Sequence, residues 1–235
     1  VLAGAFEAAE SQEFLVTIGI SPDFPSTGYG YLKQGENIET ASDRSVHQVE
    51  RFVEKPNLEK AEQYLKDGGY FWNAGMFVWR PQVILSAISK HAPELSAGLE
   101  DLSASWRETG SIGQAMDKVY PKLKKISIDF AVMEKADGVV MLESAFDWDD
   151  VGEWPAIARH YPADEQGNVF KGAGVALDAS GNLSYAEPGH TISLLGVKDL
   201  IVVQSGDATL VCHKDCAQEV KAMAQEVCRQ KPDLA

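Results

Sequence analysis

Short apolar runs alternate with helical patterns along the first two-thirds of the chain. Residues 14–20 and 46–53 are rich in β-branched and aromatic side chains, which is typical of buried strands. Residues 57–69 instead place apolar side chains at helical spacing and end in two glycines, a common helix stop. This alternation predicts an α/β fold in which helices pack on a mixed, mainly parallel sheet.

The sequence pattern changes in the last third of the chain. Two Gly-Asn turns, at residues 167–168 and 181–182, separate short β segments. Residues 200–213 have the pattern of a hairpin with a Ser-Gly-Asp turn, and a helix closes the chain. We therefore expect two domains, 1–163 and 164–235. The second is a small β-rich appendage with a terminal helix. One arrangement for its β segments is one or two coils of a β-solenoid.

Charge and cysteine content restrict the partners and the setting. The chain has 21 Lys and Arg against 35 Asp and Glu, a net charge of −14 that disfavours nucleic acid. No window reaches the roughly 18 apolar residues of a membrane span, so a membrane partner is not expected. Three cysteines without a C-x-x-C pair indicate a reducing, cytoplasmic setting. An acidic protein that binds a phosphorylated ligand would need a divalent cation beside its carboxylates.

Two glycines flank Tyr29 in the segment 27–31. Gly28 and Gly30 let the backbone approach a ligand closely and offer N–H groups to hydroxyls or phosphate oxygens. The alternative is a tight turn with packed tyrosines. Because glycines are common in turns, the segment taken alone favours that alternative.

Glu54 and Lys55 stand where a predicted strand meets Pro56. Proline ends a sheet ladder, so both charges lie at the carboxyl end of a strand, where α/β sheets bind ligands. A carboxylate can accept sugar hydroxyls, and an ammonium can neutralise a phosphate. The alternative is a surface ion pair worth about 0–1 kcal/mol. Alternation sends the two side chains to opposite faces unless the strand end is bent.

Three further polar positions are candidates for a site. Asp149 and Asp150 follow a tryptophan, and hard carboxylate oxygens suit Mg²⁺, although an aspartate there can also cap a helix. Asn73 offers both a donor and an acceptor to a sugar hydroxyl. Asp129 begins a predicted helix, so its alternative role is an N-cap.

Six segments in order along the chain resemble one family, the mannose-1-phosphate guanylyltransferases, also called GDP-mannose pyrophosphorylases. Together they cover nearly the whole chain, which makes the resemblance stronger than any single short motif. They are "TGYGYL" at 27–32, "RFVEKP" at 51–56, "FWNAGMFVWR" at 71–80, "SIDFAVMEKA" at 127–136, "FDWDDVGEW" at 146–154 and "GVKDLIVV" at 196–203.

The resemblance implies a Rossmann-like nucleotidyltransferase fold and a reaction between GTP and mannose 1-phosphate. The sugar phosphate attacks the α-phosphorus of GTP, with Mg²⁺ or another divalent cation as cofactor, and GDP-mannose and pyrophosphate are formed. The implied sugar contacts are Gly28, Tyr29, Glu54, Asn73 and Asp129. Lys55 is implied to bind the sugar phosphate and to act in catalysis, and Asp150 to be a catalytic metal ligand.

The sequence also departs from the family. Family members begin with a G-G-x-G-x-R-L-W-P loop and continue to a P-A-D-H segment, and neither is present here. We therefore expect an N-terminally incomplete sheet, no nucleotide-binding segment and no turnover by this chain alone. The alternatives are another sugar-1-phosphate nucleotidyltransferase, or a non-catalytic sugar-phosphate-binding or regulatory module. A homodimer is the default assembly.

Overall fold

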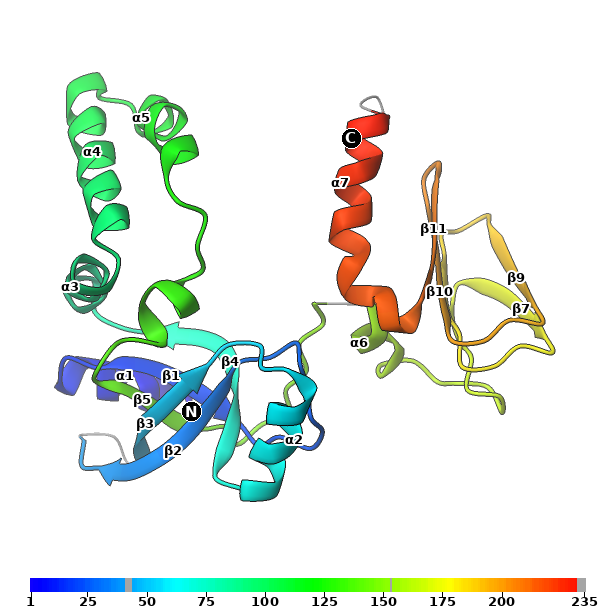
Figure 1. The fold of residues 1–235 in the computed structure, drawn as a ribbon, viewed down its shortest axis with the longest axis horizontal. Helices are drawn as coiled ribbons and strands as arrows, with labels where there is room; N and C mark the ends of the chain where they lie inside the picture. Colours follow the sequence, from blue (N-terminus) through cyan, green and yellow to red (C-terminus); the bar gives the residue numbers. More distant parts are fainter. Residues whose placement is uncertain (41–43, 153, 232–235) are drawn as a thin grey trace. The chain divides into compact units, whose positions relative to one another are not determined.

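The chain forms two compact units, Val1–Trp148 and Asp149–Ala235 (Figure 1). The computed structural model describes residues 1–40, 44–152 and 154–231. None of the helices in these ranges combines the length and the apolar character that a membrane crossing requires.

A closed barrel with the strand order β1-β4-β2-β3-β5 forms the centre of the first unit. The mixed α/β class is as predicted, but the sheet is not mainly parallel: β1 and β5 run parallel, whereas the other pairs in this barrel are antiparallel. The seven residues 39–45 that connect β2 to β3 are too few for a parallel crossover, which needs about a dozen or more. The strands are β1 (Leu15–Ile20), β2 (Tyr31–Ile38), β3 (Val46–Val53), β4 (Tyr70–Val78) and β5 (Val139–Glu143).

Helices cover this barrel and extend from it. In α2, Asn57 caps the first turn by accepting the Lys60 N–H at 3.0 Å, and Gly68 ends the helix, as the sequence predicts. The segments α3, α4 and α5 follow one another as a helical extension of the unit (Figure 1). The helices are α1 (Leu2–Ser11), α2 (Leu58–Asp67), α3 (Pro81–His91), α4 (Pro93–Thr109), α5 (Ile112–Val119), a 3₁₀ turn (Tyr120–Lys122) and a π-helix (Asp129–Met133).

Strand β1 is the most buried element of the first unit. All six of its residues are buried, and Val16 packs with Ala5 and Ala8 of α1. Thr17 is polar, yet its side chain is 0% exposed. Because a buried hydroxyl without a partner costs free energy, Thr17 must find its hydrogen bonds inside the protein.

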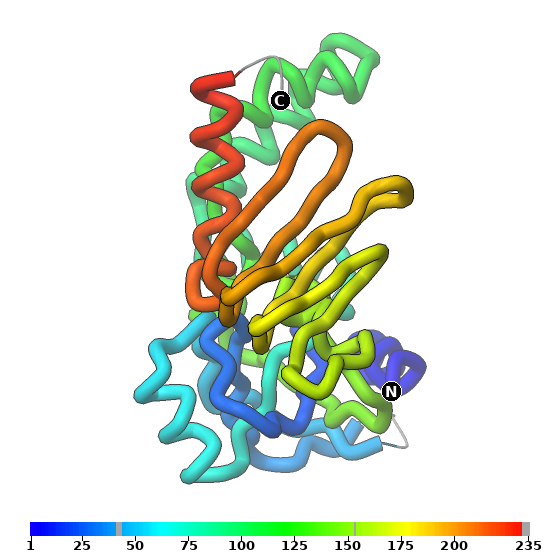
Figure 2. Tube along the Cα trace, turned by 90° about the vertical axis from the view of Figure 1, so that its right-hand side faces the viewer, coloured from blue at the N-terminus to red at the C-terminus, as the bar shows by residue number. Residues whose placement is uncertain are grey.

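The second unit is a β-solenoid followed by a helix, which is one of the arrangements predicted from the sequence. Its equivalent strands stack in parallel, β6 on β8 on β10 and β7 on β9, and its coils run side by side in Figure 2. The predicted hairpin is formed by β10 and β11. The elements are α6 (Trp154–Ala158), β6 (Val169–Lys171), β7 (Ala173–Leu177), β8 (Leu183–Ala186), β9 (Thr191–Leu195), β10 (Leu200–Ser205), β11 (Ala208–His213), a 3₁₀ helix (Lys214–Glu219) and α7 (Val220–Gln230).

The two Gly-Asn turns form stacked corners of this solenoid. The buried Asn182 donates from Nδ2 to the Asn168 Oδ1 at 2.8 Å and to the Val197 carbonyl at 3.2 Å. Its Oδ1 accepts the Leu200 N–H at 2.9 Å. Gly181, at φ 65°, supplies the left-handed backbone that the corner requires. One asparagine therefore joins three successive segments of the coil.

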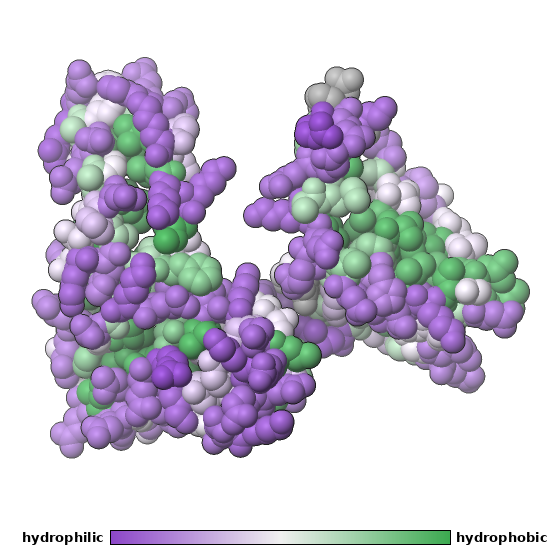
Figure 3. Space-filling view, viewed as in Figure 1, coloured by the Kyte–Doolittle hydropathy of each residue, from purple (hydrophilic) through white to green (hydrophobic). Residues whose placement is uncertain are grey.

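Both faces of the strands β7 and β9 carry apolar side chains. Ala176 and Leu194 pack inward with Val202, whereas Leu177 and Leu195 are exposed. Figure 3 shows an apolar surface over the strands of the second unit. Hydropathy alternation therefore could not reveal which face of these strands is internal.

The units divide before the predicted boundary at residue 163. Residues 149–163 belong to the second unit because Trp154 and Tyr161 pack against the solenoid cluster around Leu183. Residues 149–163 carry no β pattern of their own. The predicted boundary followed the start of the β pattern and therefore fell later in the chain.

We expect Asn182→Ala to lower the free energy of unfolding of the second unit by about 2–3 kcal/mol, because the Leu200 N–H and the Val197 carbonyl lose their partner. Hydrogen exchange of the β8 and β10 amides measures the change. Glu165→Ala, at an exposed position, is the control. Equal protection in the two variants would show that the asparagine corner does not stabilise the coil.

Candidate functional site

Gly30 lies where two of the predicted site residues meet. A Cβ on Gly30 would lie 2.6 Å from Glu54 Oε2 and 3.3 Å from Asn73 Cβ. The carboxylate of Glu54 therefore packs over the Gly30 backbone, in space that only a glycine leaves free. The group that approaches Gly30 is a side chain of the protein itself, so the predicted approach of this backbone to a ligand stays a prediction.

Asn73 is at the centre of a buried hydrogen-bond network. The Thr17 hydroxyl donates to Asn73 Oδ1 at 2.8 Å, and Asn73 Nδ2 donates to Asp129 Oδ1 at 3.4 Å. The Gly75 N–H also donates to Asn73 Oδ1, at 3.2 Å. The backbone N–H of Asn73 reaches the Gly30 carbonyl at 2.8 Å. These bonds bring residues from β1, β4 and the π-helix to one place.

A bulge in β4 produces this arrangement. Thr17 pairs with Phe77 and Gly19 with Asn73, so three residues of β4 face one residue of β1. Gly75 lies within the bulge at φ 68°, a conformation that favours glycine. Bulges re-aim side chains and are frequent beside active sites. Here the bulge turns the Gly75 N–H back toward Asn73 Oδ1.

The π-helix places two carboxylates beside Glu54. Asp129 is its first residue, and its side chain accepts from Asn73 instead of capping the helix. Glu134, just past the helix end, accepts the backbone N–H of Glu54 at 2.9 Å. Sequence reasoning missed both Glu134 and Thr17. Only Thr17 carries a signal, a hydroxyl within an apolar strand.

The surroundings of Glu54 disfavour its charged form. Burial raises the pKa of its carboxyl above the ordinary value, and the negative charge of Asp129 raises it further. The Lys55 ammonium acts in the opposite direction, whereas Glu134 adds to the rise. The carboxyl groups of Glu54, Asp129 and Glu134 lie together here, which suits a ligand with several hydroxyl groups.

Lys55 shows that the strand end is bent. It is exposed and adopts φ 46°, a left-handed conformation that is unusual for a non-glycine residue. The residue before a proline prefers extended backbone, so Lys55 is held there by its surroundings. Pro56 is buried, and β3 ends at Val53. The simple alternation of sides along the strand therefore does not apply to Glu54 and Lys55.

The structure places Gly28 and Tyr29 in a tight turn with packed aromatic rings. The Gly28 N–H donates to Ser26 Oγ at 3.2 Å. The Tyr29 ring is buried, 5.1 Å from the Trp72 ring and 5.3 Å from the Trp148 ring. This is the packed-turn alternative, and the ligand contacts of both residues stay predictions.

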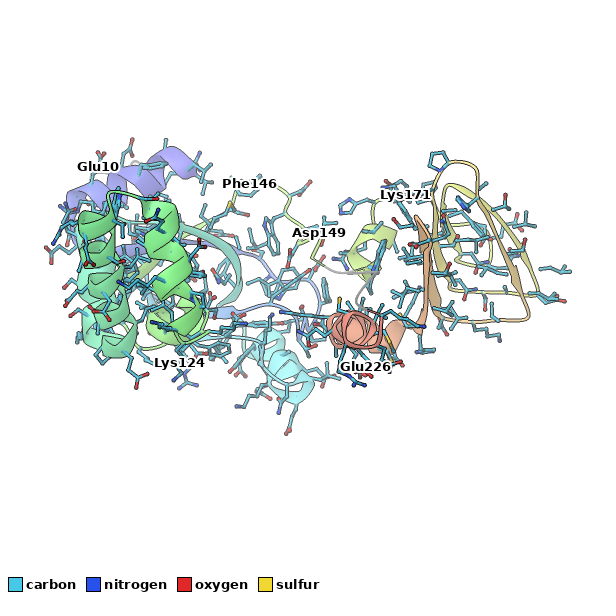
Figure 4. The ribbon with its side chains drawn as sticks, turned by 90° about the horizontal axis from the view of Figure 1, so that it is seen from above. Glu10, Lys124, Phe146, Asp149, Lys171 and Glu226 are labelled. Atoms are coloured by element: carbon cyan, nitrogen blue, oxygen red, sulfur yellow. The ribbon has the colours of Figure 1, made fainter. Side chains whose placement is uncertain are left out.

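Asp149 and Asp150 belong to the second unit. Asp149, labelled in Figure 4, accepts from Arg159 Nε at 2.8 Å and lies 2.9 Å from His160 Nε2. The hydrogen bond from Arg159 lowers the pKa of the Asp149 carboxyl. Asp150 is exposed, and its carboxylate lies beside Gly152.

Asp150 can offer one carboxylate to a metal ion. Within residues 1–40, 44–152 and 154–231, no group of three or more His, Cys, Asp or Glu side chains could hold a metal. Mg²⁺ often binds one or two carboxylates and completes its shell with water and substrate phosphates. A single carboxylate such as that of Asp150 fits an ion that arrives with a phosphorylated substrate.

Two family models match the chain. Residues 2–167 match the nucleotidyl transferase model, and residues 172–227 match the MannoseP isomerase/GMP-like beta-helix domain. The second match agrees with the stacked parallel strands of the second unit.

Known proteins similar to this chain include two curated relatives and one solved structure. The mannose-1-phosphate guanylyltransferase of Salmonella typhimurium is 37% identical over 95% of this chain and 46% of its own length. The Escherichia coli K12 enzyme of that name is 34% identical over 91% and 44%. A Thermus thermophilus crystal structure, described as a mannose-1-phosphate geranyltransferase, has a TM-score of 0.76 and 38% identity, over 96% of this chain and 63% of that one. The chain thus spans about half the length of the curated relatives it matches.

The raised pKa of Glu54 predicts a pH-dependent stability. The folded state keeps a proton on Glu54 at pH values where the unfolded chain has lost it, so stability falls as pH rises from the ordinary to the raised pKa. Glu54→Gln cannot ionise, and its melting temperature should exceed that of the wild type above this window. The advantage should shrink as the pH falls toward about 4.

Thermal unfolding of both proteins across this pH range measures the difference, with Glu62→Gln on the exposed face of α2 as the matched control. A Glu54→Gln protein that melts with the wild type at every pH would contradict the burial cost assigned to this carboxylate.

Proposed function

Because the chain belongs to the nucleotidyl transferase family, we propose that it forms the sugar-phosphate side of a mannose-1-phosphate guanylyltransferase. One observation carries the proposal: Glu54, Asn73 and Asp129, from three separate motifs, converge beside Gly30. The similarity to guanylyltransferases along more than nine-tenths of the chain supports the choice of substrates.

Each residue of the site has a role that follows from its chemistry. The carboxylates of Glu54 and Asp129 accept hydrogen bonds from sugar hydroxyls, and the Asn73 amide donates one to a hydroxyl oxygen. The exposed Lys55 ammonium neutralises the phosphate of the sugar. Lys55 thereby lowers the repulsion between this phosphate and the phosphates of the nucleotide.

The reaction is an in-line phosphoryl transfer. An oxygen of mannose 1-phosphate forms a bond to the α-phosphorus of GTP, and the bond from that phosphorus to the bridging oxygen breaks. Pyrophosphate leaves with the bond electrons, and GDP-mannose remains. Asp150 would hold Mg²⁺ through its carboxylate, and the ion would supply charge neutralisation on the phosphates. Positioning by the residues above supplies the rest of the catalysis.

We also propose a cytoplasmic setting. Cys212, Cys216 and Cys228 are free, which agrees with a reducing compartment. A homodimer remains the expected assembly.

The full-length product of the encoding gene should release pyrophosphate from GTP and mannose 1-phosphate when Mg²⁺ is supplied. Lys55→Met keeps the apolar stem and removes the ammonium. It should raise the KM for mannose 1-phosphate about 10–100-fold, because a charge-assisted contact worth about 1.5–3 kcal/mol is lost. The KM for GTP should change little.

Lys60→Met, at an exposed position on α2, is the matched control for the lost charge. Release of no pyrophosphate by the wild type with any sugar 1-phosphate and GTP would contradict the proposed function. A normal KM for mannose 1-phosphate in Lys55→Met would contradict only the role assigned to Lys55, and not the proposed function.

A further inference from the structure

Thr17 is a polar residue of β1 that faces the site from the interior, with 0% exposure. Its hydroxyl has one proton and two possible acceptors, Asn73 Oδ1 at 2.8 Å and the Met76 carbonyl at 3.3 Å. The shorter contact is to Asn73. A valine or isoleucine would suit this strand as well, so the hydroxyl calls for a reason beyond packing.

The Asn73 amide has one possible orientation. A side-chain amide can be turned over so that its oxygen and nitrogen exchange places, and its partners decide between the two. The Gly75 backbone N–H lies 3.2 Å from the atom that also faces Thr17, and an N–H can only donate. That atom is therefore the oxygen. The Thr17 hydroxyl and the Gly75 amide together occupy both of its lone pairs.

This orientation decides what Asn73 can offer to a ligand. Its nitrogen faces Asp129, which accepts one of the two protons at 3.4 Å. For the second proton the structure records no acceptor within the described residues. Asn73 has an exposed fraction of 8%, its oxygen is already occupied, and its second N–H is left for a ligand. It therefore presents a donor and no acceptor.

We propose that Thr17 is a positioning residue that, together with the Gly75 N–H, holds Asn73 as a hydrogen-bond donor to one hydroxyl of the sugar phosphate. The inference rests on the function proposed above. The oxygen of that hydroxyl accepts from Asn73 Nδ2, and its proton is donated to the carboxylate of Asp129 or Glu54. Donor and acceptors side by side match a hydroxyl, which gives and receives one bond each. A hydrogen in place of the hydroxyl leaves the second Asn73 proton without an acceptor.

The test compares Thr17→Ser with Thr17→Ala in the full-length product of the encoding gene. These two variants differ by one hydroxyl. Isothermal titration calorimetry measures the Kd of mannose 1-phosphate and of its monodeoxy analogues for each protein. Thr17→Ala should raise the Kd of mannose 1-phosphate about tenfold, and Thr17→Ser should stay within about twofold of the wild type.

The analogues separate positioning from a merely structural role. The wild type and Thr17→Ser should bind one monodeoxy analogue at least about tenfold more weakly than mannose 1-phosphate. In Thr17→Ala this penalty should shrink, because the amide is then held only by the Gly75 N–H and Asp129 and selects that hydroxyl less strictly. Thermal unfolding confirms that each variant is folded. If Thr17→Ala is unfolded, Thr17→Val keeps the branched shape and takes its place.

Two results would overturn the inference alone: an unchanged Kd in Thr17→Ala, or an equal loss of affinity for mannose 1-phosphate and every analogue. The second result would show that Thr17 only stabilises the fold. A wild-type protein that binds no mannose 1-phosphate would overturn the proposed function as well, and it would do so before any substitution is compared.

Discussion

The complete burial of β1 is the constraint on which the site depends. The strand lies between β4 and β5, so a polar side chain within it must be satisfied by its neighbours. Thr17 meets this requirement through Asn73 and the Met76 carbonyl, and both partners lie at the bulge of β4. The bulge in turn holds Asn73 beside Gly30. The packing of one interior strand thus sets the position of a side chain in the candidate site.

Irregular backbone gathers at the same place. Lys55 adopts a left-handed conformation before a proline, and Asp129 opens a π-helix, a form that occurs often at functional sites. A non-glycine residue in such a conformation costs about 1–3 kcal/mol and persists only where the surroundings determine it. Glu134 supplies one such restraint, because its carboxylate holds the Glu54 N–H. This hydrogen bond therefore fixes the π-helix to the end of β3. It also fixes the positions of the carboxylates that these two elements carry.

Local sequence patterns predicted the elements better than their pairing. Periodicity identified β1, β3, α2 and the β10–β11 hairpin, because each depends on its own residues. It did not predict the antiparallel barrel, since period-2 alternation says nothing about which strands become neighbours. The motifs predicted that Glu54, Asn73 and Asp129 belong to one site. Glu134 could not be found in this way, because its role arises from a backbone contact with a residue 80 positions away. Asp150, assigned to the metal, lies in the other unit, and its role remains a proposal.

The central claim is that this chain carries a binding site for a sugar 1-phosphate around Gly30. A titration of the isotope-labelled full-length product of the encoding gene with mannose 1-phosphate, without GTP, tests it most directly. A sugar phosphate bound at this site should cause saturable shifts of the backbone amides of Gly30, Glu54 and Lys55, and of the Asn73 side-chain amide. Shifts confined to the solenoid, or no shifts at concentrations that support pyrophosphate release, would contradict this claim.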